Sequence, residues 1–319
     1  MRLRKILTGG LLILGAAALT GCSAGLKDSY QIEERIEGRV LPEEEALASA
    51  FASDLCVVTG DSPTDPEVTA EAAAVFDLDG RDVIYSKNAF ERLYPASITK
   101  VMTALVAIKY GNLADEVTVT EDAVITESGA TLAGIEPGDR LTLEQLLYGL
   151  LLPSGNDAGA AIAVHMSGSI EAFADLMNEE ARKLGAVDTH FVNPHGLTDP
   201  EHYTTAYDLY LIFNEALKQP EFRKMTGTTS YTAVYRNGKG ESVTKTWSGG
   251  NWYMTGERQE PDGLTVFGGK TGTTSAAGYC LIMASRDAQD HEYVSVVLKA
   301  DSRPGLYDNM SNIISKIVK

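Results

Sequence analysis

The sequence predicts one α+β domain, with a mainly antiparallel sheet flanked by helices and an all-helical insertion. Strand patterns occur at residues 70–86 and again at residues 264–300, near the two ends of the globular part. The chain between them is rich in helical patterns and shows no internal repeat. Strands contributed by both ends are expected to meet in one sheet, so the helices between them form an inserted subdomain.

The first 22 residues have the pattern of a bacterial secretory signal. Basic residues come first, an apolar run broken by glycine follows, and the segment ends in Leu19-Thr20-Gly21-Cys22. The apolar run is too short for a membrane-spanning helix. Its end resembles the lipobox of bacterial lipoproteins, in which the signal is cut before a lipid-modified cysteine. The resemblance implies a signal peptide at residues 1–21, lipidation of Cys22 and attachment to the outer face of the cell membrane.

The segment after this cysteine is strongly acidic. The net charge of the chain is −17, and residues 28–71 contain 12 acidic and 2 basic residues, a net of −10. We expect residues 22–66 to form a solvated tether and the folded domain to occupy residues 67–319. An acidic chain is not expected to bind nucleic acid.

The elements of the domain follow from local patterns. An Asp-Gly turn at residues 79–80 separates two short strands and predicts a hairpin. Asp157 is expected to be the N-cap of a helix. The expected helices lie at residues 97–110, 141–152, 157–168, 170–185, 205–218 and 306–319, and the late strands at 264–274, 278–286 and 292–300.

The helix that begins near Ser97 contains a lysine in an otherwise apolar run. From Val101 to Ile108 the sequence is VMTALVAI, which is typical of a buried helix. A buried ammonium is costly unless a specific contact holds it. Ser97 lies three residues before Lys100, so both side chains can share one helix face. Burial lowers the pKa of a lysine, and a neutral Lys100 can activate the Ser97 hydroxyl. The alternative is a lysine that extends to solvent from the helix start.

Three short motifs occur in a characteristic order. They are Ser97-Ile98-Thr99-Lys100 at a helix start, Ser154-Gly155-Asn156 between two helices, and Lys270-Thr271-Gly272 on a late strand. This order resembles the penicillin-binding proteins and serine β-lactamases. The surrounding stretches PASITKVMTALVA, LLLPSGNDAGAAIA, FVNPHGL and GGKTGTTSAAGYCL are similar to the serine-type D-alanyl-D-alanine carboxypeptidases of peptidase family S11. The resemblance covers residue 67 to the C-terminus and implies a β-lactamase/transpeptidase-like fold.

The resemblance also implies the roles of individual residues. The catalytic residues would be Ser97 as nucleophile, Lys100 as base and Ser154 as proton relay. The substrate-binding residues would be Asn156, Lys270, Thr271, Gly272 and Thr273, and the backbone N–H groups of Ser97 and Thr273 would form an oxyanion hole. The partners would be the peptidoglycan stem peptide and β-lactam antibiotics, and no cofactor or metal is expected.

Several features depart from the family pattern or remain open. Relatives carry a late arginine that holds the substrate carboxylate; an approximate alignment places Leu306 there, with Arg303 three residues earlier. Relatives often add a β-rich second domain, which is not expected here. Cys56 and Cys280 are expected to be unpaired thiols, and His195 and His202 to be structural.

Three other functions are compatible with a serine–lysine site of this kind to different degrees. A β-lactamase usually has Ser-Asp-Asn as its second motif, whereas this chain has Ser-Gly-Asn, and no Glu-x-x-Leu-Asn segment is found. A D,D-endopeptidase acting on peptidoglycan cross-links would use the same residues as a carboxypeptidase. A non-catalytic wall-binding or penicillin-binding lipoprotein also remains open.

Overall fold

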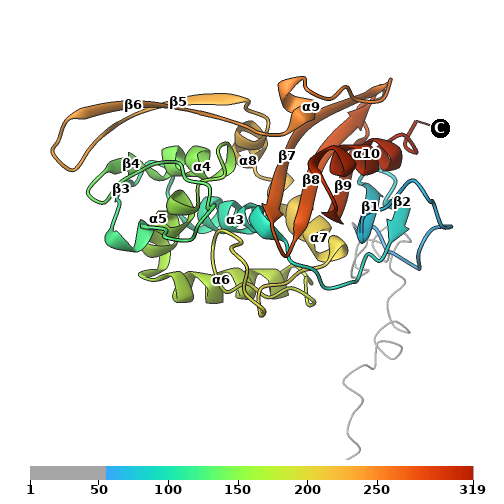
Figure 1. Cartoon of the computed structure of the whole chain (residues 1–319), viewed down its shortest axis with the longest axis horizontal. Coiled ribbons are helices and arrows are strands. Elements are labelled where there is room, and N and C mark those ends of the chain that lie inside the picture. The colour runs from blue at the N-terminus through green and yellow to red at the C-terminus, as the bar shows by residue number, and fades with distance from the viewer. Residues whose placement is uncertain (1–54, 319) are drawn as a thin grey trace, which may run out of the picture. The chain divides into compact units, whose positions relative to one another are not determined.

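The main sheet of the computed structural model has five antiparallel strands in the order β2-β1-β9-β8-β7 (Figure 1). The structure describes residues 55–318. Strand β1 pairs with both β2 and β9, so the two ends of the domain meet inside one sheet, as predicted. The strands are β1 (Ala72–Asp77), β2 (Asp82–Lys87), β7 (Leu264–Thr274), β8 (Gly278–Asp287) and β9 (Glu292–Ala300).

Helices cover both faces of this sheet. On one face lie α9 (Trp252–Thr255) and α10 (Arg303–Ile314), and on the other lies α7 (Ala206–Leu217). Alternate residues of β9 therefore contact different cores: Val296 and Leu298 face α7, whereas Val297 faces α10. Since both sides are buried, these strands read as apolar runs rather than as alternating patterns.

The inserted subdomain between β2 and β7 is mainly helical (Figure 1). Helix α3 lies at its centre, with residues Lys100 to Ala107 all buried, as the sequence predicts. The helices between β2 and β7 are η1 (Ala96–Thr99), α3 (Lys100–Tyr110), η2 (Glu121–Ala123), α4 (Leu143–Leu151), α5 (Asn156–Ser167), α6 (Ile170–Lys183), α7, α8 (Pro220–Thr226) and α9.

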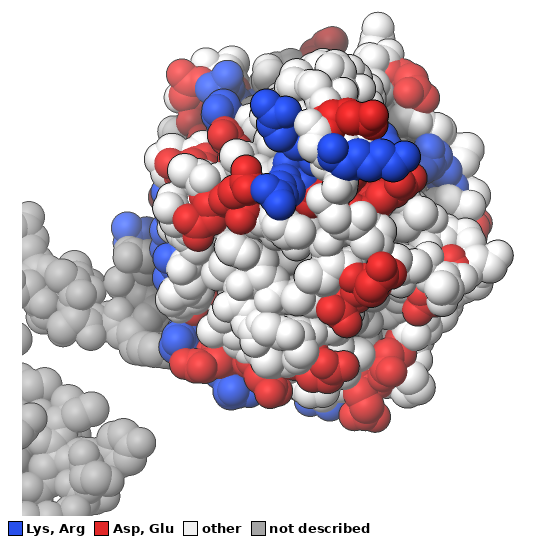
Figure 2. Space-filling model, turned by 90° about the vertical axis from the view of Figure 1, so that its left-hand side faces the viewer, with Lys and Arg blue, Asp and Glu red and all other residues white. Residues whose placement is uncertain are grey.

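A second antiparallel sheet lies in the insertion and was not predicted. Its order is β3-β4-β5-β6, with β3 (Glu116–Thr118), β4 (Arg140–Thr142), β5 (Ser230–Arg236) and β6 (Ser242–Ser248). Strands β5 and β6 form a hairpin that extends over the helices (Figure 1). Figure 2 shows this end of the domain, where basic side chains gather in the upper part and acidic side chains are spread over the rest.

The folded domain begins earlier than the expected boundary at Glu67. Cys56 is buried, and its N–H donates to the Tyr210 hydroxyl at 2.9 Å. The Ser62 N–H donates to the Ser86 carbonyl at 2.7 Å, beside the edge strand β2. The acidic composition of this segment predicts a solvated tether, and it gives no sign of these few contacts with the folded domain. The expected signal peptide, Cys22 and most of the tether lie outside the described residues.

The two cysteines of the domain, Cys56 and Cys280, are both buried and free, which confirms the prediction of unpaired thiols. Within residues 55–318, no helix is long and apolar enough to cross a lipid bilayer.

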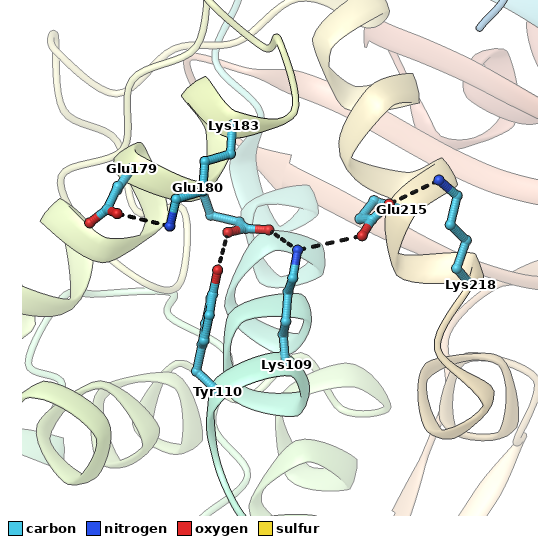
Figure 3. Close-up of polar contacts among 7 residues, drawn as sticks. All are labelled: Lys109, Tyr110, Glu179, Glu180, Lys183, Glu215 and Lys218. Carbon is cyan, nitrogen blue, oxygen red and sulfur yellow. Dashed lines mark hydrogen bonds and ion pairs between the residues drawn. The ribbon is translucent and has the colours of Figure 1, made fainter. Parts of the chain in front are cut away.

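A buried carboxylate joins three helices of the insertion (Figure 3). Glu180 on α6 is fully buried and accepts hydrogen bonds from Lys109 at 2.6 Å and from the Tyr110 hydroxyl, both on α3. Burial alone would raise the pKa of Glu180, but these hydrogen bonds outweigh it and the pKa is lowered. Lys109 also contacts Glu215 on α7 at 3.5 Å. The network therefore fixes α3 against α6 and α7.

Candidate active site

Ser97 lies in the short helix η1, directly before α3. The preceding residue, Ala96, has a φ of 47°, a left-handed conformation that is uncommon for alanine. Gly196 packs against this turn so closely that a Cβ atom there would lie 1.8 Å from the Ala96 carbonyl oxygen. Contact with the loop around Gly196 thus holds the turn in a strained form, as is frequent at functional sites.

Lys100 occupies the first turn of α3 and is completely buried. Its Nζ atom lies 2.8 Å from Ser97 Oγ, 2.7 Å from Asn156 Oδ1 and 2.7 Å from the His195 carbonyl oxygen. Burial, with a further contribution from the positive charge of Lys270, holds the pKa of Lys100 well below its usual value. A neutral amine has two N–H groups and one lone pair. It can therefore donate to Asn156 and His195 and accept the proton of Ser97.

Lys270 and Ser154 form the next part of the site. Lys270 on β7 is buried, and its Nζ donates to Ser154 Oγ at 3.0 Å and to the Thr271 carbonyl at 2.8 Å. Burial lowers the pKa of Lys270 to about 7. Ser154 itself has a φ of 64°, again in the left-handed region. The structure thus brings two buried lysines and two serines together from three separate segments.

Strand β7 lies directly against the turn that carries Ser97. A Cβ atom on Gly272 would lie 2.9 Å from the Pro95 carbonyl oxygen, 3.0 Å from Ser97 N and 3.1 Å from Ile98 N. Glycine permits this approach because it has no side chain. The N–H groups at the start of a helix lack intrahelical acceptors. The Ser97 N–H is therefore available beside Thr273, where the predicted oxyanion hole requires it.

Asn156 and Asp157 begin helix α5, but Asp157 is not its N-cap, so that prediction was wrong. The N-cap is Gly155. The Asp157 carboxylate instead accepts hydrogen bonds from the N–H groups of Ala133 and Gly134, both at 2.7 Å, and of Ile135 at 3.2 Å. It lies in the first turn of the helix, where the helix dipole favours a negative charge. Asp157 fixes the adjacent loop, so its role is to position the wall of the site.

Two grooves meet at Ser97. The large groove has a volume of about 630 Å³ and is lined by Ser97, Asn156 and residues 127–131, 195–198 and 273–276. The small groove has a volume of about 210 Å³ and is lined by Ser97, Thr131, residues 152–154, Ser248, Gly250, residues 271–273 and Arg303. A peptide that spans both grooves would present one of its carbonyl groups to Ser97.

Both histidines near the site are buried and have low pKa values. Burial lowers the pKa of His195 and of His202 to about 3 in each case. His195 contributes its backbone carbonyl to Lys100, and the His202 ring contacts Thr99 Oγ1 at 2.8 Å. These contacts agree with the expected structural role. Sequence reasoning missed the carbonyl contact, since every residue has a carbonyl and the pattern carries no signal for it.

Leu306 and Arg303, both on α10, differ in their surroundings. Leu306 is buried in the core beneath the sheet, whereas Arg303 is exposed and lines the small groove beside Ser97 and Thr271. The Arg303 guanidinium lies 5.8 Å from the centre of the Trp252 ring. Among residues 55–318, no group of three or more His, Cys, Asp or Glu side chains is arranged to bind a metal ion.

The site thus combines a serine at a helix start with a buried lysine that is hydrogen-bonded to it, and both lie beside the edge strand of an antiparallel sheet. Acyl-transfer enzymes use serine–lysine sites of this kind. The model of the peptidase S11 family, described as D-alanyl-D-alanine carboxypeptidase, matches residues 59–302. The chain therefore belongs to the D-alanyl-D-alanine carboxypeptidase family.

Individual relatives agree with this assignment. D-alanyl-D-alanine carboxypeptidase DacF of Bacillus subtilis is 37% identical over 222 residues, which are 68% of this chain and 54% of DacF. DacD of Escherichia coli is 34% identical over 274 residues, which are 81% of this chain and 65% of DacD. The chain thus spans between about half and two thirds of the length of these relatives. DacB2 of Mycobacterium tuberculosis is 35% identical over 66% of this chain and 69% of its own length.

Solved structures confirm the expected β-lactamase/transpeptidase-like fold. The crystal structure of the Streptomyces K15 DD-transpeptidase has a TM-score of 0.73 and 30% identity, and the alignment covers 80% of this chain and 98% of that one. The D-alanyl-D-alanine carboxypeptidase of Mycobacterium tuberculosis H37Rv has a TM-score of 0.69 and 29% identity, covering 82% and 94% of the two chains.

Proposed function

We propose that this protein is a serine D,D-carboxypeptidase that removes the terminal D-alanine from peptidoglycan stem pentapeptides through an acyl-enzyme. The observation that carries the proposal is the 2.8 Å contact between Ser97 Oγ and the Nζ atom of a fully buried Lys100. A serine hydroxyl reacts only when a base removes its proton. Burial and the neighbouring charge of Lys270 hold the pKa of Lys100 well below its usual value, which favours the neutral form that can do so.

The acylation step uses both lysines. Lys100 takes the proton of Ser97, and Oγ attacks the carbonyl carbon between the two D-alanines. The backbone N–H groups of Ser97 and Thr273 stabilise the oxyanion, a contribution of about 3 kcal/mol per donor. Ser154, which accepts from Lys270, passes a proton to the departing amine of D-alanine and takes in exchange the proton that Lys100 removed from Ser97, so Lys100 is neutral again. In hydrolysis Lys100 takes a proton from the attacking water and returns it to Ser97 Oγ as the ester bond breaks.

The small groove holds the leaving D-alanine. Its terminal carboxylate would contact Thr271 and Thr273, with the positive charges of Lys270 and Arg303 beside them. Arg303 thus supplies from the start of α10 the cation that relatives carry one helical turn later. We expect Arg303→Gln to raise KM about tenfold with little change in kcat, since it removes a hydrogen bond to a charged group. Arg140→Gln, an exposed arginine outside both grooves, is the matched control. Equal KM values for the two variants would refute the role of Arg303.

The test of the function is the release of D-alanine from a peptide that ends in D-Ala-D-Ala. The full-length protein should release it, and Ser97→Ala should not, with thermal unfolding showing that the variant is folded. A radioactive or fluorescent penicillin should acylate the wild type at Ser97. Lys100→Ala should abolish acylation, and its persistence would exclude Lys100 as the base.

Two related activities use the same acyl-enzyme. A D,D-endopeptidase would act on cross-linked muropeptides, whose leaving group is larger than D-alanine. Transfer to an amine instead of water is the second candidate, because 30% identity and a TM-score of 0.73 relate the chain to a protein titled a DD-transpeptidase. Adding an acceptor amine to the release assay separates the two outcomes, since transfer yields a new peptide and hydrolysis does not. A penicillin-binding wall protein without turnover would show acylation and no product.

The proposed location is the outer face of the bacterial membrane, with a lipid on Cys22. The support is the pattern of residues 1–22, in which basic residues, an apolar run and Leu-Thr-Gly-Cys occur in order. The mature protein should begin at Cys22 and carry a diacylglycerol mass. Cys22→Ala should release the protein from membranes, whereas Cys56→Ala, which removes a buried thiol, should not.

A further inference from the structure

The two grooves that meet at Ser97 carry opposite charges. Of the described residues that line the small groove, Arg303 is the one charged side chain. Of those that line the large groove, Glu127 is the one Asp, Glu, Lys or Arg. Since the small groove takes the substrate carboxylate, the large groove takes the acyl portion of the peptide. Its single carboxylate indicates that the acyl portion carries a positive charge.

Glu127 is held in a defined position on the wall of the large groove. Its carbonyl oxygen accepts a hydrogen bond from the Ala130 N–H at 3.1 Å, and Gly129 has a φ of 81°, so residues 127–130 form a turn. Its carboxylate is exposed and has no hydrogen bond or ion pair with other residues of the range 55–318. An exposed carboxylate without a partner, on a residue that lines a groove of about 630 Å³, is available for a ligand cation.

The substrate chemistry places a cation within reach. An extended peptide can lie along β7, which is the edge strand of the main sheet, as ligands of edge strands commonly do. The residue before the two D-alanines is then about 3.3 Å along the strand from the residue that Ser97 attacks. In peptidoglycan stems this residue is a diamino acid, whose side chain ends in an amine. Because Ser97 and Glu127 line the same groove, the side chain of this residue lies in the groove whose wall carries Glu127.

We propose that Glu127 binds the side-chain ammonium of the diamino acid in the stem peptide and thereby determines the preferred substrate. This inference rests on the proposed carboxypeptidase function. The preferred stem peptide has a free, positively charged amine on the side chain of this residue. Acylation of the amine, as in a cross-link, removes the charge and weakens binding. A second carboxylate on the same side chain has no cationic partner in the large groove, so lysine is favoured over unamidated diaminopimelate.

The experiment compares three peptides with full-length protein. One is L-Ala-γ-D-Glu-L-Lys-D-Ala-D-Ala, the second is identical with the lysine amine acetylated, and the third is acetyl-D-Ala-D-Ala. For the wild type, kcat/KM for the free-amine peptide should exceed that for the acetylated peptide about fivefold at low ionic strength, as for an exposed ion pair. Half-molar salt should reduce this ratio toward one.

Charge variants identify the residue responsible. Glu127→Gln should give a ratio near one, and Glu127→Lys a ratio below one. The rate on acetyl-D-Ala-D-Ala, which lacks the diamino acid, is measured for each variant as its own reference. Glu121→Gln, which removes the same charge from η2 outside both grooves, should keep the wild-type ratio. Equal values of kcat/KM for the wild type on the two pentapeptides would overturn the role of Glu127 but not the proposed function. An undiminished ratio of the two values in Glu127→Gln would do the same. No release from any of the three peptides would overturn both the assignment and the proposed function.

Discussion

Replacing Gly272 with alanine should impair acylation without unfolding the protein. The new Cβ atom would lie 2.9 to 3.1 Å from three backbone atoms of residues 95–98, whereas ordinary contacts begin near 3.4 Å. The turn that carries Ser97 must therefore move by about 0.3–0.5 Å away from β7. This displacement separates the two N–H groups of the proposed oxyanion hole, those of Ser97 and Thr273, one on each side of the contact.

The expected effects differ greatly between catalysis and stability. A 1 Å misplacement in an active site can cost about 100-fold, so a shift of half that size should reduce the acylation rate about tenfold or more. The free energy of unfolding should change by only about 1 kcal/mol, because alanine is favoured over glycine in a strand and offsets part of the strain.

The assay is the rate of acylation by a fluorescent penicillin, measured beside thermal unfolding. Gly238→Ala is the matched control. Gly238 lies in the turn of the distant β5–β6 hairpin, and a Cβ atom on it would lie 3.3 Å from the Gly138 Cα atom. The control should acylate at the wild-type rate. Wild-type acylation by Gly272→Ala, or an equal loss in both variants, would refute the argument that this close contact aligns the oxyanion hole.

The other predictions concern charge and pH. The value of kcat/KM should fall as the pH rises above about 7, because burial lowers the pKa of Lys270 to about 7 and its charge is proposed to attract the substrate. Lys270→Arg should move this decline to higher pH, and a decline at the same pH would assign it to another group. The free energy of unfolding should fall as the pH drops from 6.5 toward 3, because His195 and His202 stay neutral in the folded protein to about pH 3 but become protonated in the unfolded chain. Urea titrations should show a smaller loss in His202→Gln. Glu180→Gln should lower the free energy of unfolding by about 1–3 kcal/mol, because its buried hydrogen bonds are weakened (Figure 3), and unchanged stability would show that the network contributes nothing.

The sequence was most informative where a pattern is local. The Asp-Gly turn between two apolar strands predicted the first hairpin, and the apolar run after Lys100 predicted a buried helix; both are present. The β5–β6 hairpin was missed although β5 alternates between buried and exposed residues and an Asn-Gly pair lies in the turn. This signal was available, because a half-buried strand alternates with a period of two.

Other errors came from residues whose local role and tertiary role differ. Asp157 has the sequence context of a helix cap, yet its carboxylate binds backbone N–H groups more than twenty residues earlier. Cys56 lies in an acidic segment that reads as solvated, yet it is buried against Tyr210. A carboxylate or a thiol can take either role, and which one it takes depends on what the fold places beside it.

By itself, the sequence determined the α+β class, the order of the three motifs and the apolar helix that follows Lys100, since each follows from residue type and spacing along the chain. Only the tertiary structure decided how the site is assembled. Lys100 meets the His195 carbonyl across 95 residues, and Lys270 meets Ser154 across 116. It also placed Arg303 and Glu127 in the two different grooves that meet at Ser97. Contacts over such separations depend on how the sheet and helices pack, and no local pattern of residues records that packing.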